Sequence, residues 1–394
     1  MGSAMRYGEL NPPNRILLGP GPSNVHPIVL RALSSPLVGH LDPYFMERMD
    51  EVMELLRETF VTKNRVCFPI SGTGMAGMEA AISNLVQPGE EVIVGSNGFF
   101  GQRMAEIVRR YHGKPIEVSE EWGRAIDPSK VEEALSRSGA DLVCIVHAET
   151  STGVLQPLEE IGKIAHAHDA LFLVDAVTSL SGCELKVDEM GIDVCYSGSQ
   201  KCLNCPPGLA PITFNERAMD RVRNRRAKAQ NWYLDVSLIE QYWSEGRAYH
   251  HTAPISMIYA LREALRIIVE EGLEKRWIRH ERNRDALIRG IEEMGLRMHA
   301  RENRCPTLNT VSVPEGVEDA KVRGFLLDRF NMEIGGGLGP LKGKIWRVGL
   351  MGINSSEQNV ILFLGALERA LRASGFRVKG SGAKAAIEAY SERG

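Results

Sequence analysis

Short apolar runs alternate with amphipathic stretches over the first two thirds of the chain. The apolar runs, which contain few polar residues, lie at 91–96, 141–148, 170–177 and 193–199. The amphipathic stretches, with apolar residues three and four positions apart, lie at 44–60, 102–113, 127–139 and 157–169. Runs of the first kind are typical of strands buried on both faces, and stretches of the second kind are typical of helices. Their alternation predicts an α/β fold with a doubly wound, mostly parallel sheet covered by helices on both faces.

The pattern changes near residue 271. A long helical stretch begins at Pro254, and a looser succession of strand, helix, strand and helix follows it, which predicts a smaller α+β domain. The opening segment is rich in turn residues, so we expect an extended arm there. We therefore divide the chain into an N-terminal arm (1–23), a large domain (24–271) and a small C-terminal domain (272–394). The tail from Lys379 is predicted to be frayed.

Length and charge narrow the classes of protein that the chain can represent. Its 394 residues exceed what a single core usually holds. The net charge of −3 gives no electrostatic reason to expect nucleic acid as a partner. Because no apolar run approaches about 20 residues, we expect no membrane span. Several of the seven cysteines lie inside apolar runs, which favours reduced thiols and a cytoplasmic location.

A glycine-rich turn opens the predicted helix in ISGTGMAGMEA. Gly72 and Gly74 flank Thr73 just before good helix formers. Free backbone N–H groups at such a helix start bind phosphate, and a threonine hydroxyl adds a donor. An ordinary capped turn explains the same residues equally well, and the spacing fits neither the P-loop nor the dinucleotide-binding pattern.

An aspartate and a lysine follow in an informative order. Asp175 ends the apolar run ALFLVDAV, where ligands bind in α/β sheets. A carboxylate buried there needs a cationic partner such as a protonated pyridine nitrogen, although a helix-capping role is the plain alternative. Lys201 comes 26 residues later, in YSGSQKCLNCPPG. A partly desolvated lysine has a lowered pKa and a nucleophilic amine, whereas a solvated loop lysine would not.

At this point the chain resembles the alanine–glyoxylate and serine–pyruvate branch of the class V aminotransferases. The resemblance extends from about Leu17 to Arg372 and is carried by SGTGMAGMEA, VGSNGFFGQR, VHAETSTGVLQPL, LVDAVTSLSG, YSGSQKCLNCPPG, YHHTAP and GGGLGP…WRVGLMG. It implies fold type I of the pyridoxal-phosphate (PLP) transferases and a homodimer with shared active sites. The implied cofactor is pyridoxal 5'-phosphate, and no metal is expected.

The resemblance also assigns roles to residues. The implied cofactor site consists of Thr73, Gly74, Met75, Phe100, Thr150, Asp175, Val177, Gln200, Lys201, Tyr249 and Thr252. Lys201 would form the Schiff base and Asp175 would face the pyridine nitrogen. Phe100 and Val177 would pack on opposite faces of the ring. Met75 stands where many relatives carry histidine, and Phe100 where tryptophan is common.

The same resemblance implies how substrates and the second subunit take part. Arg347 in KIWRVGLM would hold the substrate carboxylate in a bidentate manner, with Thr150 close to both cofactor and substrate. Tyr249 and Thr252 would reach the cofactor phosphate of the other subunit. The expected reaction moves an amino group from a small amino acid, alanine or serine, to the 2-oxo acid glyoxylate or pyruvate, with Lys201 as general base and acid.

Several alternatives remain open. Ureidoglycine–glyoxylate aminotransferase is a close relative with a different amino donor, and another fold type I PLP enzyme, such as a cysteine desulfurase, is a further possibility. Desulfurases carry a histidine before the lysine, where this chain has Gln200. A protein that binds PLP or a nucleotide without catalysis is a third class. Cys202 and Cys205 form a CxxC, which is compatible with a redox pair or half of a zinc site, but no second pair stands at zinc-ribbon spacing.

Overall fold

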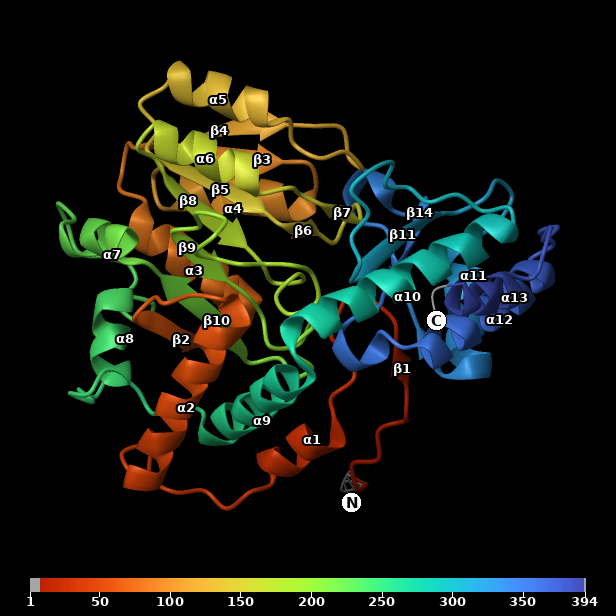
Figure 1. The fold of residues 1–394 in the computed structure, drawn as a ribbon, viewed down its shortest axis with the longest axis horizontal. Helices are drawn as coiled ribbons and strands as arrows, with labels where there is room; N and C mark the ends of the chain where they lie inside the picture. Colours follow the sequence, from red (N-terminus) through yellow and green to blue (C-terminus); the bar gives the residue numbers. More distant parts are fainter. Residues whose placement is uncertain (1–7, 393–394) are drawn as a thin grey trace, which may run out of the picture.

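A computed structural model describes residues 8–392, so residues 1–7 of the predicted arm and residues 393–394 lie outside the described range. A seven-stranded sheet forms the centre of the larger part (Figure 1). In spatial order its strands are β2 (Val66–Ser71), β10 (Leu209–Phe214), β9 (Val194–Tyr196), β8 (Leu171–Asp175), β5 (Leu142–Val146), β3 (Glu91–Ser96) and β4 (Lys114–Ser119). Only β10 is antiparallel to its neighbours, so the mostly parallel α/β prediction is confirmed.

The four apolar runs are the strands β3, β5, β8 and β9, as predicted. The pattern did not reveal β2, β4 and β10. Strand β4 lies at one edge of the sheet and carries exposed polar residues, so it lacks an apolar run. Strands β2 and β10 contain Pro69 and Pro211, which face each other in the ladder. Proline lowers the strand signal, although an edge strand such as β2 tolerates it.

Helices cover both faces of this sheet. On one side α3 (Gly74–Leu85) and α4 (Phe99–Arg110) pack on β3, β9 and β10, and α7 (Glu216–Arg223) packs on α3. On the other side α5 (Pro128–Ser136) and α6 (Glu159–Ala167) pack on β3, β4 and β8. The remaining helices of this part are α1 (Pro27–Leu33), α2 (Pro43–Phe60), α8 (Val236–Trp243) and α9 (Ile255–Glu271). The short hairpin strands β6 (Ala148–Glu149) and β7 (Val154–Leu155) lie beyond β5. The doubly wound arrangement of the prediction is therefore observed.

A second hydrophobic core lies to the right in Figure 1. It is built on β11 (Leu308–Ser312), β14 (Ile345–Gly349) and β13 (Gly335–Gly336), with α10 (Leu273–Glu293), α11 (Asp319–Phe330), α12 (Glu357–Ala373), α13 (Gly382–Ser391) and two 3₁₀ turns, η1 (Gly339–Leu341) and η2 (Gly352–Asn354). The arm adds strand β1 (Ile16–Leu17), which pairs with β12 (Met332–Glu333). Leu18 of the arm belongs to this second core. The domain limits at residues 23 and 271 remain a prediction.

The expectation of a frayed tail from Lys379 is wrong. Helix α13 packs on α10 and α12. Tyr390 is 5% exposed, and its hydroxyl donates a hydrogen bond of 2.7 Å to Asn283. Small residues permit this close packing, because a Cβ on Gly290 of α10 would lie 2.7 Å from the Gly382 carbonyl oxygen. The small side chains that looked like a loose tail are therefore the ones that let two helices approach.

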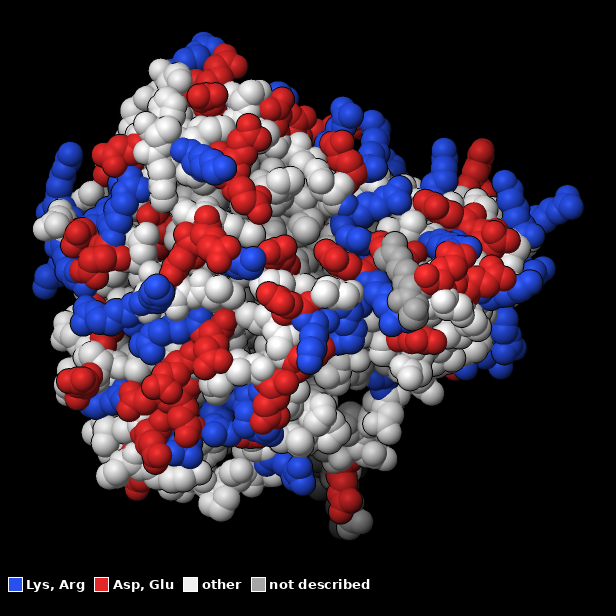
Figure 2. Space-filling model, viewed as in Figure 1, with Lys and Arg blue, Asp and Glu red and all other residues white. Residues whose placement is uncertain are grey.

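Acidic and basic side chains are interspersed over the face shown in Figure 2, as expected for a chain with a net charge of −3. Among residues 8–392, no helix combines the length and the apolar character that crossing a membrane requires.

Candidate active site

A cavity of about 160 Å³ opens at the carboxyl edge of the central sheet. It is lined by Thr73, Gly74, Met75, Met78, Phe100, Val146, Ala148, Thr150, Asp175, Val177, Thr178, Gln200 and Lys201. These residues follow the carboxyl ends of β2, β3, β5, β8 and β9, which all point in one direction. Nine of the predicted cofactor residues thus meet in one place, at the edge where α/β proteins bind ligands. A cavity of roughly this size accepts a benzene-sized ring.

The first end of the cavity is the start of helix α3. Thr73 is its N-cap but makes no capping hydrogen bond through its side chain. Among the residues that the structure describes, the N–H groups of Gly74 and Met75 have no acceptor. A dianion here would receive both N–H groups and would lie at the positive end of the helix dipole. The amide oxygen of Gln200 is also buried at the cavity without a donor.

The Asp175 carboxylate closes the deep end. It is 4% exposed and accepts hydrogen bonds from the Tyr196 hydroxyl at 2.7 Å and from the Val177 N–H at 2.8 Å. Burial raises the pKa of Asp175 to about 6, although both hydrogen bonds favour the charged form and oppose this shift. A cationic ring nitrogen beside it would restore the ionised carboxylate.

Lys201 stands on the loop after β9. Burial lowers the pKa of its amine to about 8, and the charge of Arg347 lowers it further. The Lys201 amine donates to the Pro20 carbonyl oxygen. At this pKa about a tenth of the amine is unprotonated at pH 7, far more than for an ordinary lysine, and the unprotonated amine is the form that attacks a carbonyl carbon.

The N-terminal arm is pressed against this lysine. Gly21 has a φ of +105°, and a Cβ there would lie 2.5 Å from the Lys201 amine nitrogen. The Ser23 hydroxyl donates to the Lys201 carbonyl oxygen at 2.7 Å. The arm therefore contacts both ends of the same residue. The sequence predicted an extended arm that shapes the pocket, and the structure shows this arm against Lys201.

Arg347 lies on β14 and does not line the 160 Å³ cavity, but its charge acts on Lys201. It is 8% exposed, and its Nε donates to the Gly336 carbonyl oxygen at 2.6 Å. Gly335, which pairs with Arg347 in the sheet, is also in contact with Pro20, since a Cβ on Gly335 would lie 2.5 Å from that ring. Pro20 of the arm therefore contacts both Lys201 and the strand that pairs with Arg347. Burial lowers the pKa of Arg347 to about 10, whereas the charge of Glu149 opposes this shift.

Tyr249 and Thr252 do not join this cavity within the chain. Both are exposed on the segment between α8 and α9, and 65% of Tyr249 is accessible. The Tyr249 ring lies 5.4 Å from the ring of His40. Their predicted contact with a second subunit therefore remains a prediction.

One buried acid near the site was not singled out from the sequence. Glu149 is 1% exposed and accepts hydrogen bonds from the N–H groups of Phe100 and Ser151, at 2.9 and 3.0 Å. It thereby anchors the start of helix α4, which carries Phe100. Burial raises the pKa of Glu149, although these hydrogen bonds oppose the shift. The signal was a charged residue in the apolar context VHAET.

The CxxC cysteines are both buried free thiols. In the range 8–392, no group of three or more histidine, cysteine or acidic side chains is placed to hold a metal ion.

The family model described as "Aminotransferase class-V" matches residues 30–354. A lysine with a lowered pKa beside a helix start and a buried aspartate, at the edge of a doubly wound sheet, is the arrangement of a PLP-dependent transferase. The chain belongs to the class V aminotransferases, and it has the fold type I of PLP enzymes.

Relatives match almost the whole chain. It is 43% identical to the crystal structure of ureidoglycine–glyoxylate aminotransferase from Bacillus subtilis, with a TM-score of 0.95 over 98% of this chain and all (100%) of that one. It is 47% identical to alanine–glyoxylate aminotransferase from Nostoc sp., with a TM-score of 0.92 over 93% of this chain and 98% of the other. It is also 41% identical to alanine–glyoxylate aminotransferase of Rattus norvegicus, covering 92% of this chain and 89% of the relative.

The residues in the cavity fit the family's cofactor, pyridoxal phosphate. Unpaired N–H groups at the start of α3 suit its phosphate. The Asp175 carboxylate, held by Tyr196, suits the ring nitrogen, and the Lys201 amine suits the aldehyde. Each group of the cofactor would thus meet a complementary group that is incompletely satisfied in the protein alone.

The raised pKa of Asp175 predicts how the cofactor-free protein responds to pH. Because the folded pKa of about 6 exceeds the ordinary 3.8, the native state holds this proton more tightly, and stability falls as pH rises through that window. Asp175→Asn lacks the effect. Between pH 4 and pH 7 the free energy of unfolding of the variant should therefore rise relative to that of the wild type by up to about 3 kcal/mol. Urea unfolding of both proteins measures this, and a difference that does not change with pH would contradict it.

Proposed function

We propose that this aminotransferase moves an amino group from alanine or serine to glyoxylate or pyruvate. The observation that carries the proposal is the Arg347 guanidinium beside the lysine. In the described part of the chain no carboxylate lies within ion-pair distance of Arg347, and only its Nε has a hydrogen bond. A buried arginine without an acidic partner is costly unless a ligand supplies the charge. A substrate carboxylate at Arg347 would place the α-carbon toward Lys201.

Each residue of the site has a defined task in this proposal. Arg347 orients the substrate through two parallel hydrogen bonds. The Lys201 amine, with its pKa of about 8, removes the α-proton as general base and later donates it as general acid. When bound, pyridoxal phosphate accepts the electron pair released from the α-carbon. Asp175 would favour a positive charge on the ring nitrogen of the bound cofactor. Phe100 and Val177 would restrict the space on the two faces of that ring.

Ureidoglycine is the second candidate donor. The relatives named for alanine–glyoxylate and ureidoglycine–glyoxylate transfer are similar to this chain at 47% and 43% identity. Both names share glyoxylate as the acceptor, which favours glyoxylate for this chain as well. The donors differ in the group beyond the α-carbon. The methyl group of alanine and the hydroxymethyl group of serine are small enough to lie near the apolar ring of Phe100. The larger ureido group fits as well only if the mouth of the site is open.

We predict that Lys201 alone carries the cofactor. Borohydride should reduce the bond and fix the cofactor to the peptide that contains Lys201, and Lys201→Ala should lose turnover and covalent labelling while still binding pyridoxal phosphate non-covalently. Mass spectrometry of the reduced peptide gives the answer. Label on a different lysine would contradict the assignment.

Arg347→Lys tests the carboxylate site and the donor at once. It keeps the charge but loses the bidentate geometry, so kcat/KM with alanine, serine or ureidoglycine and with glyoxylate should fall at least tenfold, since losing such a partner costs about 2–5 kcal/mol. Stopped-flow spectroscopy of both half-reactions measures this for each donor.

Amines without a carboxylate are the control for Arg347→Lys. Their slow reaction should be unchanged, because they make no contact with Arg347. An equal loss for amines and for alanine would contradict the role. The donor with the highest kcat/KM in the wild type decides between alanine, serine and ureidoglycine.

We also propose a homodimer in which Tyr249 and Thr252 serve the partner's site. Exposed aromatic residues support it: Trp232 and Tyr233 pack on the ring of His250, and Tyr249, one residue before His250, packs on His40. Trp232 is 62% exposed, an unusual exposure for a tryptophan. An exposed apolar surface of this kind is typical of an interface.

Light scattering tests the dimer. The wild type should have twice the mass of one chain, and Trp232→Asp should shift it toward the monomer and weaken cofactor retention. Ile387→Asp is the matched control, because Ile387 is 47% exposed on α13, outside this group of aromatic residues. A monomeric wild type with full activity would contradict the proposal.

The cytoplasmic location stays part of this proposal. All seven cysteines are free and buried, which fits a reducing compartment.

A further inference from the structure

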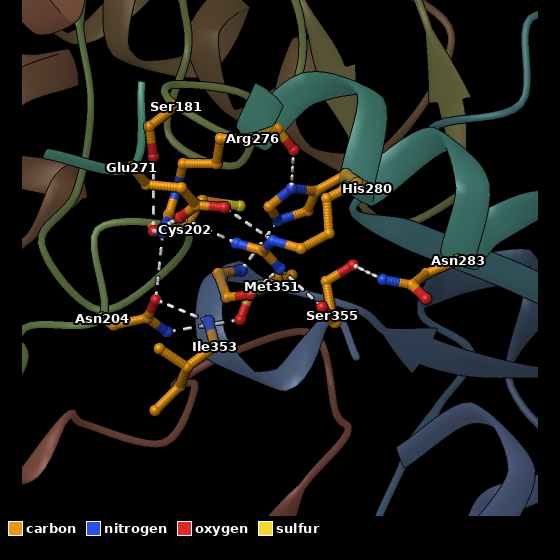
Figure 3. A network of polar contacts seen from close by, with 12 residues as sticks. Ser181, Cys202, Asn204, Glu271, Arg276, His280, Asn283, Met351, Ile353 and Ser355 are labelled. Atoms are coloured by element: carbon orange, nitrogen blue, oxygen red, sulfur yellow. Dashed lines mark hydrogen bonds and ion pairs between the residues drawn. The ribbon is translucent and has the colours of Figure 1, made fainter. Parts of the chain in front are cut away.

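Asn204 lies where four distant segments meet (Figure 3). It is 3% exposed and belongs to the loop that carries Lys201. The other three segments are the N-terminal arm, helix α10 and the loop that follows β14. Figure 3 shows its amide between the side chain of Arg276 and the residues Met351 and Ile353. No sequence motif singled it out.

The amide nitrogen of Asn204 binds the arm and the loop after β14. It donates to the Ser23 hydroxyl at 2.9 Å, to the Asn24 carbonyl at 3.1 Å and to the Met351 carbonyl at 3.3 Å. The Ser23 hydroxyl in turn donates to the carbonyl of Lys201 at 2.7 Å. A chain of hydrogen bonds therefore runs from the Asn204 amide through the arm to the backbone of Lys201.

The amide oxygen of Asn204 binds the opposite side. It accepts from the Ile353 N–H at 2.8 Å and from Arg276 at 3.2 Å. Arg276 is 1% exposed, donates to the Cys202 carbonyl at 2.6 Å and pairs with Glu271 at 2.5 Å. Helix α10 thereby holds the lysine loop directly and also through Asn204.

The loop after β14 is fitted closely to this amide. Gly352 has a φ of +58°, and a Cβ there would lie 1.7 Å from the amide oxygen of Asn204. The Gly352 N–H donates to His280 at 2.9 Å, and its carbonyl accepts from Arg279 at 2.9 Å. The loop is thus fixed on both sides, and any shift of Asn204 must move it.

These contacts join the two groups that the proposed function requires. Lys201 stands three residues before Asn204, and Arg347 stands on β14, just before the loop that Asn204 holds. The arm between them touches the lysine amine through Pro20. We infer that Asn204 is a positioning residue that sets the distance between the Lys201 amine and the Arg347 guanidinium. The inference deepens the proposed function and rests on its assignment of these two groups.

Asn204→Asp removes the donor of the amide and keeps its acceptor. The carboxylate keeps an acceptor for Ile353 and Arg276, so the contact with α10 is retained. It has no donor and faces the carbonyl oxygens of Asn24 and Met351, which repel it. The variant should therefore fold but release the arm and the loop after β14 from the lysine loop.

Asn283→Asp is the matched control. Asn283 is also 3% exposed, and its amide donates to Ser355 at 3.0 Å. It accepts from Tyr390, and among the described residues its hydrogen bonds reach neither the lysine loop nor the arm; it touches the loop after β14 only at the far end, through Ser355. The same chemical change at equal burial should lower the melting temperature of the holoenzyme without moving the readouts below.

Three readouts distinguish positioning from a general loss of stability. In Asn204→Asp the KM for amino acid and oxo acid should rise about tenfold or more, since small misplacements are costly, whereas the single-turnover rate with a carboxylate-free amine should stay within about twofold of wild type. Trypsin should cleave the holoenzyme after Arg15 faster, because Asn24 holds the Arg15 carbonyl at 2.9 Å. The pH midpoint of the bound cofactor's visible absorbance should shift, because it reports the surroundings of Lys201.

Ser23→Ala provides a second variant in case Asn204→Asp fails to fold. It breaks the same hydrogen-bond chain without adding charge, so it should show the same three changes in weaker form. Combined with Asn204→Asp it should add little, because both act through one chain.

The outcomes separate the possible errors. If Asn204→Asp behaves as Asn283→Asp in KM, proteolysis and absorbance, or if the two changes are additive, the positioning role is overturned. If the absorbance and proteolysis respond but none of the proposed substrates reacts with the wild type, the positioning role stands and the proposed substrates are wrong.

Discussion

Burying two ionisable groups in one small cavity is the constraint on which the rest of the structure depends. Asp175 and Lys201 both lose water, and burial moves their pKa values in opposite directions, to about 6 and about 8. Each shift favours the neutral form, so the protein alone pairs neither charge fully. The cofactor carries complementary groups for both. Binding it therefore relieves a cost that folding the chain imposes.

Elements outside the central sheet hold Asp175 and Lys201 in their surroundings. Five parallel strands end at the cavity and fix its floor, but Arg347 and Pro20, which act on Lys201, come from elsewhere. Arg347 belongs to strand β14, beside the second core, and Pro20 belongs to the arm. Glu149 adds a charge that favours protonated Arg347 and disfavours ionised Asp175. One buried acid thus acts on both ends of the site through its field.

The parts of the fold that could be predicted are those whose pattern lies within a short stretch of sequence. Strands buried on both faces have a local signature, so the centre of the sheet could be located by pattern, together with the turn at Thr73 and Gly74 and with Asp175 and Lys201. The resemblance added Met75, Phe100, Thr150, Val177 and Gln200, but nothing pointed to Met78, Val146, Ala148 and Thr178, which also line the cavity. The edge strand β4 and the proline-bearing β2 lack such a signature. The arm was expected to shape the pocket, but its contact of Gly21 with Lys201 could not be located by pattern, because it joins residues 180 positions apart. Helix α13 was missed because its small residues look alike in a packed helix and in a loose tail.

The docking of the arm has a consequence for the order in which the molecule is built. The N–H of Asn24 donates to Asn354 across 330 residues, and Ile16 pairs with Met332. A ribosome making about 5–20 residues per second exposes the arm long before either partner exists. The central sheet can form meanwhile, since the strands that compose it end at residue 214. The arm must wait, so the mouth of the active site closes last, and a chain interrupted late in synthesis holds a finished sheet with an unfinished site.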